Sequence, residues 1–198
     1  MKSILLFCII YSISRHNYVF AMAAILALFV SLLPQILQRN FRISLPWEID
    51  CLITFALVLH IFFGEVLNFY EKVYIFDKGM HFFGTAIVAI LGFMFVYAIH
   101  YLTSINLTLP SMGFFIVVFS LAVGALWEIA EFTVDQVFGL TTQYGLYDTM
   151  LDLIYDFFGG VVVSILGIFY IKKLEPKSRI KFHRSIREAF HIRNGERQ

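Results

Sequence analysis

DKGMHFFGTAIVAILGF, at Asp77–Phe93, recurs 75 positions later as DLIYDFFGGVVVSILGI, at Asp152–Ile168. Asp, Phe-Phe, Gly, Val, Ile, Leu and Gly agree in register, which indicates an internal repeat. Each copy begins with an acidic residue, has a second polar residue four positions later (His81 or Asp156), and continues as an apolar run long enough to cross a bilayer. Ionisable side chains are costly inside hydrocarbon, so these matched polar pairs predict a functional site.

The composition is that of a polytopic membrane protein. Of the 198 residues, 60% are hydrophobic and only 15% are charged, which excludes an ordinary soluble domain. A helix needs about 20 apolar residues to cross a hydrocarbon core of ~30 Å. Five segments of about this length predict an all-α transmembrane bundle, and they cover residues 18–37, 49–69, 79–102, 111–131 and 150–171.

A shorter apolar segment, 3–14, precedes these five. We expect it to be a short, retained first helix, the alternatives being a re-entrant segment or a signal peptide. The predicted fold is therefore a bundle of five or six helices with an internal two-helix parallel repeat. Residues 1–171 form the membrane domain, and residues 172–198 form a basic tail.

The orientation follows from the positive charges. Nine of the fifteen Lys and Arg residues lie after Ile171, and positively charged segments stay in the cytoplasm. We therefore predict a multi-pass protein with a cytoplasmic C-terminus. Phe182, Ile186 and Phe190 recur every four residues among basic residues, which predicts an amphipathic helix on the inner leaflet, the alternative being a solvated tail.

This topology gathers acidic residues at the outer membrane face. Nine of the fourteen carboxylates fall there, and only Lys72 and Lys78 lie near enough in sequence to offset them. Such an excess of negative charge predicts metal cations, protons or a cationic substrate at this face. The ionisable residues at or within the ends of the predicted spans are Glu65, Asp77, His81, Glu128, Glu131, Asp148, Asp152 and Asp156.

Residue spacing suggests roles for this set, because residues three or four apart share one face of a helix. Glu128 and Glu131 are predicted to be catalytic, one of them as a general base. Carboxylate oxygens with a single imidazole suit Mg²⁺, Mn²⁺ or Zn²⁺. The predicted ligands of such a divalent metal are Asp77, His81, Asp148, Asp152, Asp156 and Glu65.

Two alternatives stay open for the acidic residues. Carboxylates close together in a low-dielectric setting share protons, so the same set would suit a proton relay or an acid–base pair. Asp77 and Asp148 stand just before apolar runs and would also suit helix N-caps.

The other polar and small residues have structural interpretations. His60 and His100 are predicted to serve packing or interhelical hydrogen bonds, and Cys8 and Cys51 to be apolar core residues. The glycines of the repeat are predicted to allow close helix contact, and they are Gly84, Gly92, Gly159, Gly160 and Gly167.

Several motifs together carry a family resemblance. Asp77-Lys-Gly-Met-His81-Phe-Phe-Gly84 is followed by Glu128-Ile-Ala-Glu131 and then by Gln143-Tyr-Gly-Leu-Tyr-Asp148-Thr-Met-Leu-Asp152. Over about residues 15–171 this order resembles the YjdF-like family of bacterial inner-membrane proteins, which is distantly similar to VanZ-like membrane proteins. The resemblance implies a helical fold in the bacterial plasma (inner) membrane and brings no established reaction.

Three functions fit these observations. The first is a metal-assisted membrane enzyme that acts at the outer face on a lipid or lipid-linked envelope substrate. The second is a small proton- or cation-coupled transporter, which the repeat favours, and the third is an accessory membrane subunit. The expected partners are membrane lipids and a lipid-linked small molecule; nucleic acid is not expected, and no oligomeric state follows from the sequence.

Overall fold

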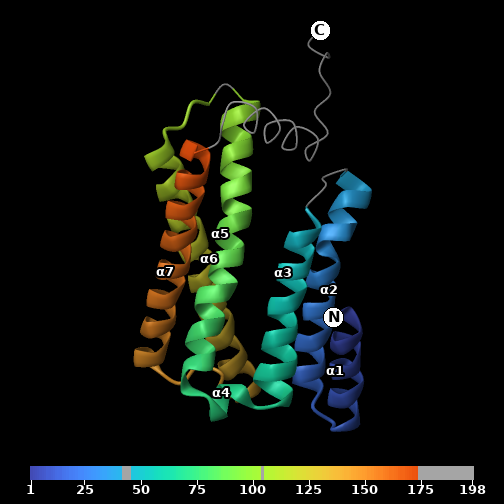
Figure 1. The fold of residues 1–198 in the computed structure, drawn as a ribbon. Coiled ribbons are helices and arrows are strands. Elements are labelled where there is room, and N and C mark those ends of the chain that lie inside the picture. The colour runs from blue at the N-terminus through green and yellow to red at the C-terminus, as the bar shows by residue number, and fades with distance from the viewer. Residues whose placement is uncertain (42–45, 104, 174–198) are drawn as a thin grey trace.

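A computed structural model describes residues 1–41, 46–103 and 105–173, and the regular structure in these ranges is helical (Figure 1). The described part of the chain confirms the predicted all-α bundle. Residues 174–198, which carry most of the predicted basic tail, lie outside it. In chain order the elements are α1 (Lys2–Ser14), α2 (Tyr18–Phe41), α3 (Trp47–Val58), the π-helix η1 (Leu59–Val66), α4 (Phe69–Lys72), α5 (Tyr74–Leu102), α6 (Leu109–Phe138) and α7 (Leu146–Lys173).

Five helical segments in the described ranges are long and apolar enough to cross a membrane. They correspond to the five predicted spans, with α3 and η1 forming one continuous segment. The segment 3–14 is also a helix, α1, which at 13 residues is shorter than the others. The five segments are Tyr18–Arg39, Trp47–Val66, Tyr74–Tyr101, Leu109–Phe138 and Leu146–Lys173.

The helices form two packed groups, α1–α3 and α5–α7 (Figure 1). Within the second group, α5 and α7 run in the same direction and α6 packs against both in the opposite direction, as the repeat predicts. Helix α5 also contacts α3 and η1 and so joins the groups. The two copies of the repeat therefore lie side by side.

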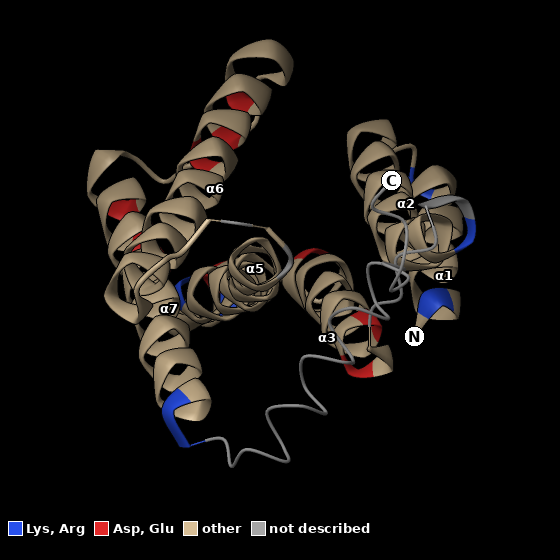
Figure 2. Cartoon of the chain, turned by 90° about the horizontal axis from the view of Figure 1, so that it is seen from above, with Lys and Arg blue, Asp and Glu red and all other residues tan. Residues whose placement is uncertain are grey.

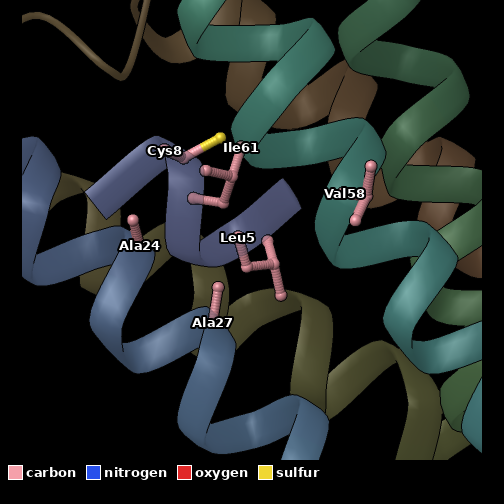
Figure 3. Packing of buried hydrophobic residues seen from close by; sticks show 6 residues of the cluster. All are labelled: Leu5, Cys8, Ala24, Ala27, Val58 and Ile61. Atoms are coloured by element: carbon pink, nitrogen blue, oxygen red, sulfur yellow. The ribbon is translucent and has the colours of Figure 1, made fainter. Parts of the chain in front are cut away.

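A small apolar core holds the N-terminal helices together (Figure 3). Ala24 and Ala27 of α2 are buried against Leu5 and Cys8 of α1, and their small side chains allow the helices to approach closely. Val58 and Ile61 complete the cluster from α3 and η1. Lys2 Nζ lies 3.3 Å from Asp50 Oδ1 and ties the start of α1 to the first turn of α3.

The helices of the second group extend beyond the predicted apolar runs. Helix α5 begins at Tyr74, α6 ends at Phe138 and α7 begins at Leu146. Hydropathy drops at the first charged residues, whereas the backbone continues as helix because these side chains find partners inside the bundle. The residue before α5 is Val73, with no side-chain cap, so the interpretation of Asp77 as an N-cap is wrong.

Glycines bring α7 close to α5 and α6. A Cβ on Gly159 would lie 2.6 Å from the Phe82 carbonyl oxygen, and one on Gly160 would collide with the Ser120 hydroxyl. These two positions thus confirm the predicted close helix contact. Gly84 does not, because a Cβ there would meet no atom within 4 Å; it lines a cavity instead.

We expect Gly159→Ala to destabilise the protein by about 1–3 kcal/mol, since the added methyl group would meet backbone that cannot yield. Gly79→Ala is the matched control on α5, where a Cβ meets nothing within 4 Å, and it is expected to stabilise by up to ~1 kcal/mol through helix propensity. Thermal unfolding of both variants in detergent measures the difference. Equal unfolding midpoints would contradict the close contact.

Candidate functional site

A buried lysine lies at the centre of the acidic cluster. Lys78 of α5 has only 3% of its side chain exposed, and its Nζ lies 2.9 Å from Asp77 Oδ2 and 2.8 Å from Asp152 Oδ1. It also donates a short hydrogen bond to Asp148 of α7. A buried charge is tolerated only when it is paired and hydrogen-bonded. The ammonium group therefore joins α5 to α7 and neutralises part of the carboxylate charge.

A second contact between the repeat copies lies about one turn deeper. His81 Nδ1 is 3.2 Å from Asp156 Oδ1, and Thr85 Oγ1 donates to the same oxygen. His81 and Asp156 occupy equivalent positions of the repeat. An ionised carboxylate can only accept hydrogen bonds, so the proton of this contact belongs on Nδ1. Asp156 thereby orients the imidazole and leaves Nε2 for other partners.

The free nitrogen of His81 faces three more carboxylates. Its Nε2 lies 3.5 Å from Glu128 Oε1, 3.9 Å from Asp77 Oδ1 and 3.9 Å from Asp152 Oδ1. These distances are within ion-pair range and too long for direct hydrogen bonds. The imidazole is therefore held at one end and surrounded by acceptors at the other.

Three buried carboxylate oxygens in this cluster make no hydrogen bond to the described residues. One of them, Asp152 Oδ1, is in an ion pair with Lys78 Nζ at 2.8 Å. The other two are Glu128 Oε1 and Asp156 Oδ2, on side chains that are 6% and 1% exposed. A buried polar group without a partner is costly. These oxygens therefore indicate where a proton, a cation or a polar group of a ligand would be stabilised.

The loop between α6 and α7 covers the cluster. Asp135 accepts hydrogen bonds from the backbone N–H groups of Thr142 and Gln143, at 2.8 and 2.9 Å. Gln143 Nε2 then lies 3.4 Å from Glu128 Oε2. Gly139 has a φ of 67°, in the left-handed region that favours glycine, and ends α6 so that the loop can fold back.

A glycine on α6 makes room for Asp156. A Cβ on Gly124 would collide with the Asp156 carboxylate, so the close approach of α7 depends on this glycine. The effect is to bury the carboxylate against helix backbone. Gly124 lies outside the repeat and carries no charge, and only the register of α6 against α7 reveals its role.

A cavity of about 500 Å³ opens between the two helix groups and ends at this cluster. Its wall is mainly apolar, with contributions from α2, α3, α5 and α6. Pockets of this size and composition commonly hold small ligands. The polar residues of the wall gather at one end, and they are His60, Tyr70, Asp77, His81, Thr85, Glu131 and Asp156.

Aromatic residues surround the polar end of the cavity. The His60 ring makes edge contacts with Tyr70 and Trp127, at centroid distances of 5.6 and 5.3 Å. Burial and the nearby Asp77 raise the pKa of Tyr70 well above its usual value, so its hydroxyl stays protonated, and it shares a hydrogen bond with His60 Nδ1. Trp127 Nε1 donates to Glu131 Oε1 at 2.8 Å. His60 thus has the predicted interhelical hydrogen bond and also lines the cavity.

His60 lies on η1, whose π-helical hydrogen bonding interrupts the predicted span 49–69. π-Helical turns are rare and are often found at functional sites. A Cβ on Gly64 of η1 would collide with the Tyr70 ring, so this glycine admits the tyrosine. The second histidine, His100, accepts a hydrogen bond from the Leu107 backbone N–H at 3.0 Å, which confirms its structural role.

The structure brings most of the predicted site residues together, on α5, α6 and α7. Figure 2 shows acidic positions along α6 in red. One ligand atom each from Asp77, His81 and Asp152 lies within 4.8 Å of the others. Asp148, Asp156 and Glu128 adjoin them through Lys78 and His81, and Glu131 lines the cavity. Glu65 lies apart: it is exposed, and no hydrogen bond or ion pair joins it to the described cluster.

Lys78→Met is expected to destabilise the protein by roughly 3–5 kcal/mol, because it leaves the buried carboxylate of Asp152 and the partly buried carboxylates of Asp77 and Asp148 uncompensated. Lys72→Met, at an exposed lysine that donates to the Leu67 carbonyl, is the control and should change stability by less than about 0.5 kcal/mol. Thermal unfolding measures both. Adding Asp148→Asn to Lys78→Met should recover part of the loss; equal stability of Lys78→Met and wild type would refute the role of the ammonium.

Comparison with known proteins agrees with this architecture. An uncharacterized protein of Thermotoga maritima is 35% identical over 144 residues, which is 71% of each chain. No solved structure matches the chain. A family model described as a predicted membrane protein (DUF2238) matches residues 1–173, so the chain belongs to the DUF2238 family of membrane proteins.

Proposed function

We propose that this protein is a membrane-embedded enzyme that carries out acid–base chemistry on the head group of a lipid or lipid-linked molecule. The observation that carries the proposal is the apolar cavity whose polar end is formed by His81, Asp77 and Asp156. An apolar chain would occupy the cavity, and its head group would then lie beside the cluster.

His81 is the proposed proton-transfer residue. The Nδ1 atom of His81 lies 3.2 Å from Asp156 Oδ1. In such an arrangement the carboxylate orients the imidazole and stabilises its protonated form. Nε2 is left without a direct hydrogen bond and lies 3.5 Å from Glu128. Glu128 is proposed to exchange the proton with His81, and Glu131 to contact the substrate from the cavity wall.

Supporting residues keep this arrangement in place. Thr85 donates to Asp156, and Gln143 holds the second oxygen of Glu128 from the covering loop. Lys78 offsets the charge of its three aspartates, so that the carboxylates can lie this close together. Positioning of this kind reduces the reorganisation that a proton transfer requires.

We expect His81→Gln to slow the reaction by at least about 100-fold, the usual contribution of a general acid or base. The control is His100→Gln, at the other end of the same helix, where Gln can still accept the Leu107 hydrogen bond. Protein reconstituted into liposomes of a total bacterial lipid extract is incubated, and mass spectrometry follows the lipids that are consumed and formed. Wild type and His100→Gln should convert at least one species.

Absence of any conversion by the wild type, or equal conversion by His81→Gln, would overturn the enzyme proposal. The second candidate function is proton- or cation-coupled transport, which the unpartnered oxygens of Glu128 and Asp156 favour. Proton uptake into the same liposomes without lipid conversion would select it.

A divalent metal is a further proposal for this cluster, with Asp77, His81 and Asp152 as ligands. Such an ion would supply Lewis-acid polarisation of the substrate. Two of these ligands, Asp77 and Asp152, are also partners of Lys78, whose Nζ lies 2.9 Å from Asp77 Oδ2 and 2.8 Å from Asp152 Oδ1.

Elemental analysis of the purified protein tests the metal. If the site holds a metal, wild type contains it near-stoichiometrically and Asp77→Ala/Asp152→Ala loses it. The control Glu48→Ala/Asp50→Ala removes two acidic residues from α3, away from the cluster, and should retain the metal. If none of the three proteins contains metal, the metal proposal is wrong, and Lys78 and His81 alone supply the positive charge of the cluster.

The proposed location is the bacterial inner membrane with the C-terminus in the cytoplasm. It is supported by the nine Lys and Arg residues after Ile171 and by the resemblance to YjdF-like and VanZ-like proteins. In this orientation the cluster lies at the outer face. A reporter enzyme that works only in the cytoplasm should therefore be active when it is fused after residue 198.

A further inference from the structure

The charge of the cavity wall is not balanced by the cluster itself. Three carboxylates line the cavity, those of Asp77, Glu131 and Asp156. Lys78 contacts Asp77 and His81 contacts Asp156, but no basic side chain of the described chain forms an ion pair with the Glu131 carboxyl group. A ligand in the cavity would therefore meet one acidic group, that of Glu131, which has no cationic partner.

Glu131 and Asp156 both lack a complete set of hydrogen-bond partners among the described residues. The one hydrogen bond that the structure gives the Glu131 carboxylate among the described residues comes from Trp127 Nε1, a neutral donor, to Oε1. Asp156 Oδ2 is buried on a side chain that is 1% exposed, and it has no hydrogen-bond partner in the described part of the chain. Both side chains belong to the cavity wall. A cationic group that donates hydrogen bonds or neutralises charge would satisfy them.

The aromatic residues next to Glu131 favour the same kind of group. His60 contacts both Tyr70 and Trp127 in the cavity wall. Aromatic faces attract ammonium groups, Trp most strongly, and such rings combined with a carboxylate recognise alkylated amines. An anionic head group such as a phosphate would instead meet like charge.

The rest of the wall suits a hydrocarbon chain. Leu33 and Leu37 of α2, Leu57 of α3, and Val88 and Leu91 of α5 line it. Gly84 widens the cavity on α5, because no atom lies within 4 Å of the position of its Cβ. The wall thus combines an apolar slot with an acidic, aromatic end.

From this combination we propose that the cavity binds a single-chain amphiphile with a cationic amine head group, which lies between Glu131, Trp127 and Asp156. This inference rests on the proposed function and names the substrate class for the same site. The head group would lie next to His81, the residue proposed to transfer protons.

Native mass spectrometry of the full-length protein, released from a neutral detergent, measures binding of three probes with the same chain. They are dodecyltrimethylammonium, dodecyl phosphate and dodecyl glycerol ether. We expect wild type to bind the ammonium probe at least about tenfold more tightly than the phosphate. Glu131→Gln keeps the acceptor for Trp127 and removes the charge, so it should weaken ammonium binding about tenfold and leave the glycerol ether unchanged.

Two further variants separate the head group from the chain. Trp127→Leu should weaken binding of the ammonium probe about fivefold without affecting the ether. Gly84→Leu fills the cavity and should abolish binding of all three probes, whereas Gly79→Leu, at an open position outside the cavity, should bind like wild type. Unfolding midpoints show that each variant is folded.

The outcomes distinguish the two proposals. Equal affinity of wild type for the ammonium and phosphate probes, or no effect of Glu131→Gln and Trp127→Leu, would overturn the cationic head group while the cavity site stands. Absence of binding by wild type, or unchanged binding by Gly84→Leu, would overturn the cavity site and the proposed function with it.

Discussion

The ammonium group of Lys78 is the interaction on which the C-terminal helices depend. Asp77, Asp148 and Asp152 come from two helices that pack side by side, and their carboxylates would repel one another inside a membrane. One buried cation between them turns this repulsion into an attraction between α5 and α7. The glycines of α7 then allow the backbones to approach, and His81 can reach Asp156.

The cluster has two parts with different surroundings. Around Lys78 the positive and negative groups are in direct contact, which makes this part structural. Around His81, Glu128 and Glu131 the distances are longer, buried oxygens lack hydrogen-bond partners among the described residues, and the cavity begins. The proposed proton transfer and head-group binding concern this second part, where an incoming group could improve the electrostatic balance.

The sequence predicted the fold well because hydropathy, helix length and the repeat report directly on membrane spans. It also predicted that acidic residues from separate helices would meet, since the topology places them at one end of the bundle. The role of Lys78 was not predictable in this way. It is adjacent to Asp77, and only the register of α5 against α7 shows that it also reaches Asp148 and Asp152.

The cavity was harder still to predict. Trp127 and Tyr70 are neutral residues in an aromatic-rich chain, and nothing in the local sequence distinguishes them from lipid-facing residues. Gly84 has the same sequence context as Gly159, yet it borders open space while Gly159 contacts backbone. The difference arises from the neighbours that each copy of the repeat meets in three dimensions.

The contact between His81 and Asp156 also bears on how the two copies diverged. These residues are equivalent in the repeat, so their hydrogen bond joins matching positions of the two copies. Two identical copies would place the same side chain at both positions, as two carboxylates or two imidazoles. After a gene duplication, replacing one of the two would relieve that clash, and the unlike pair would then make each copy specific for the other.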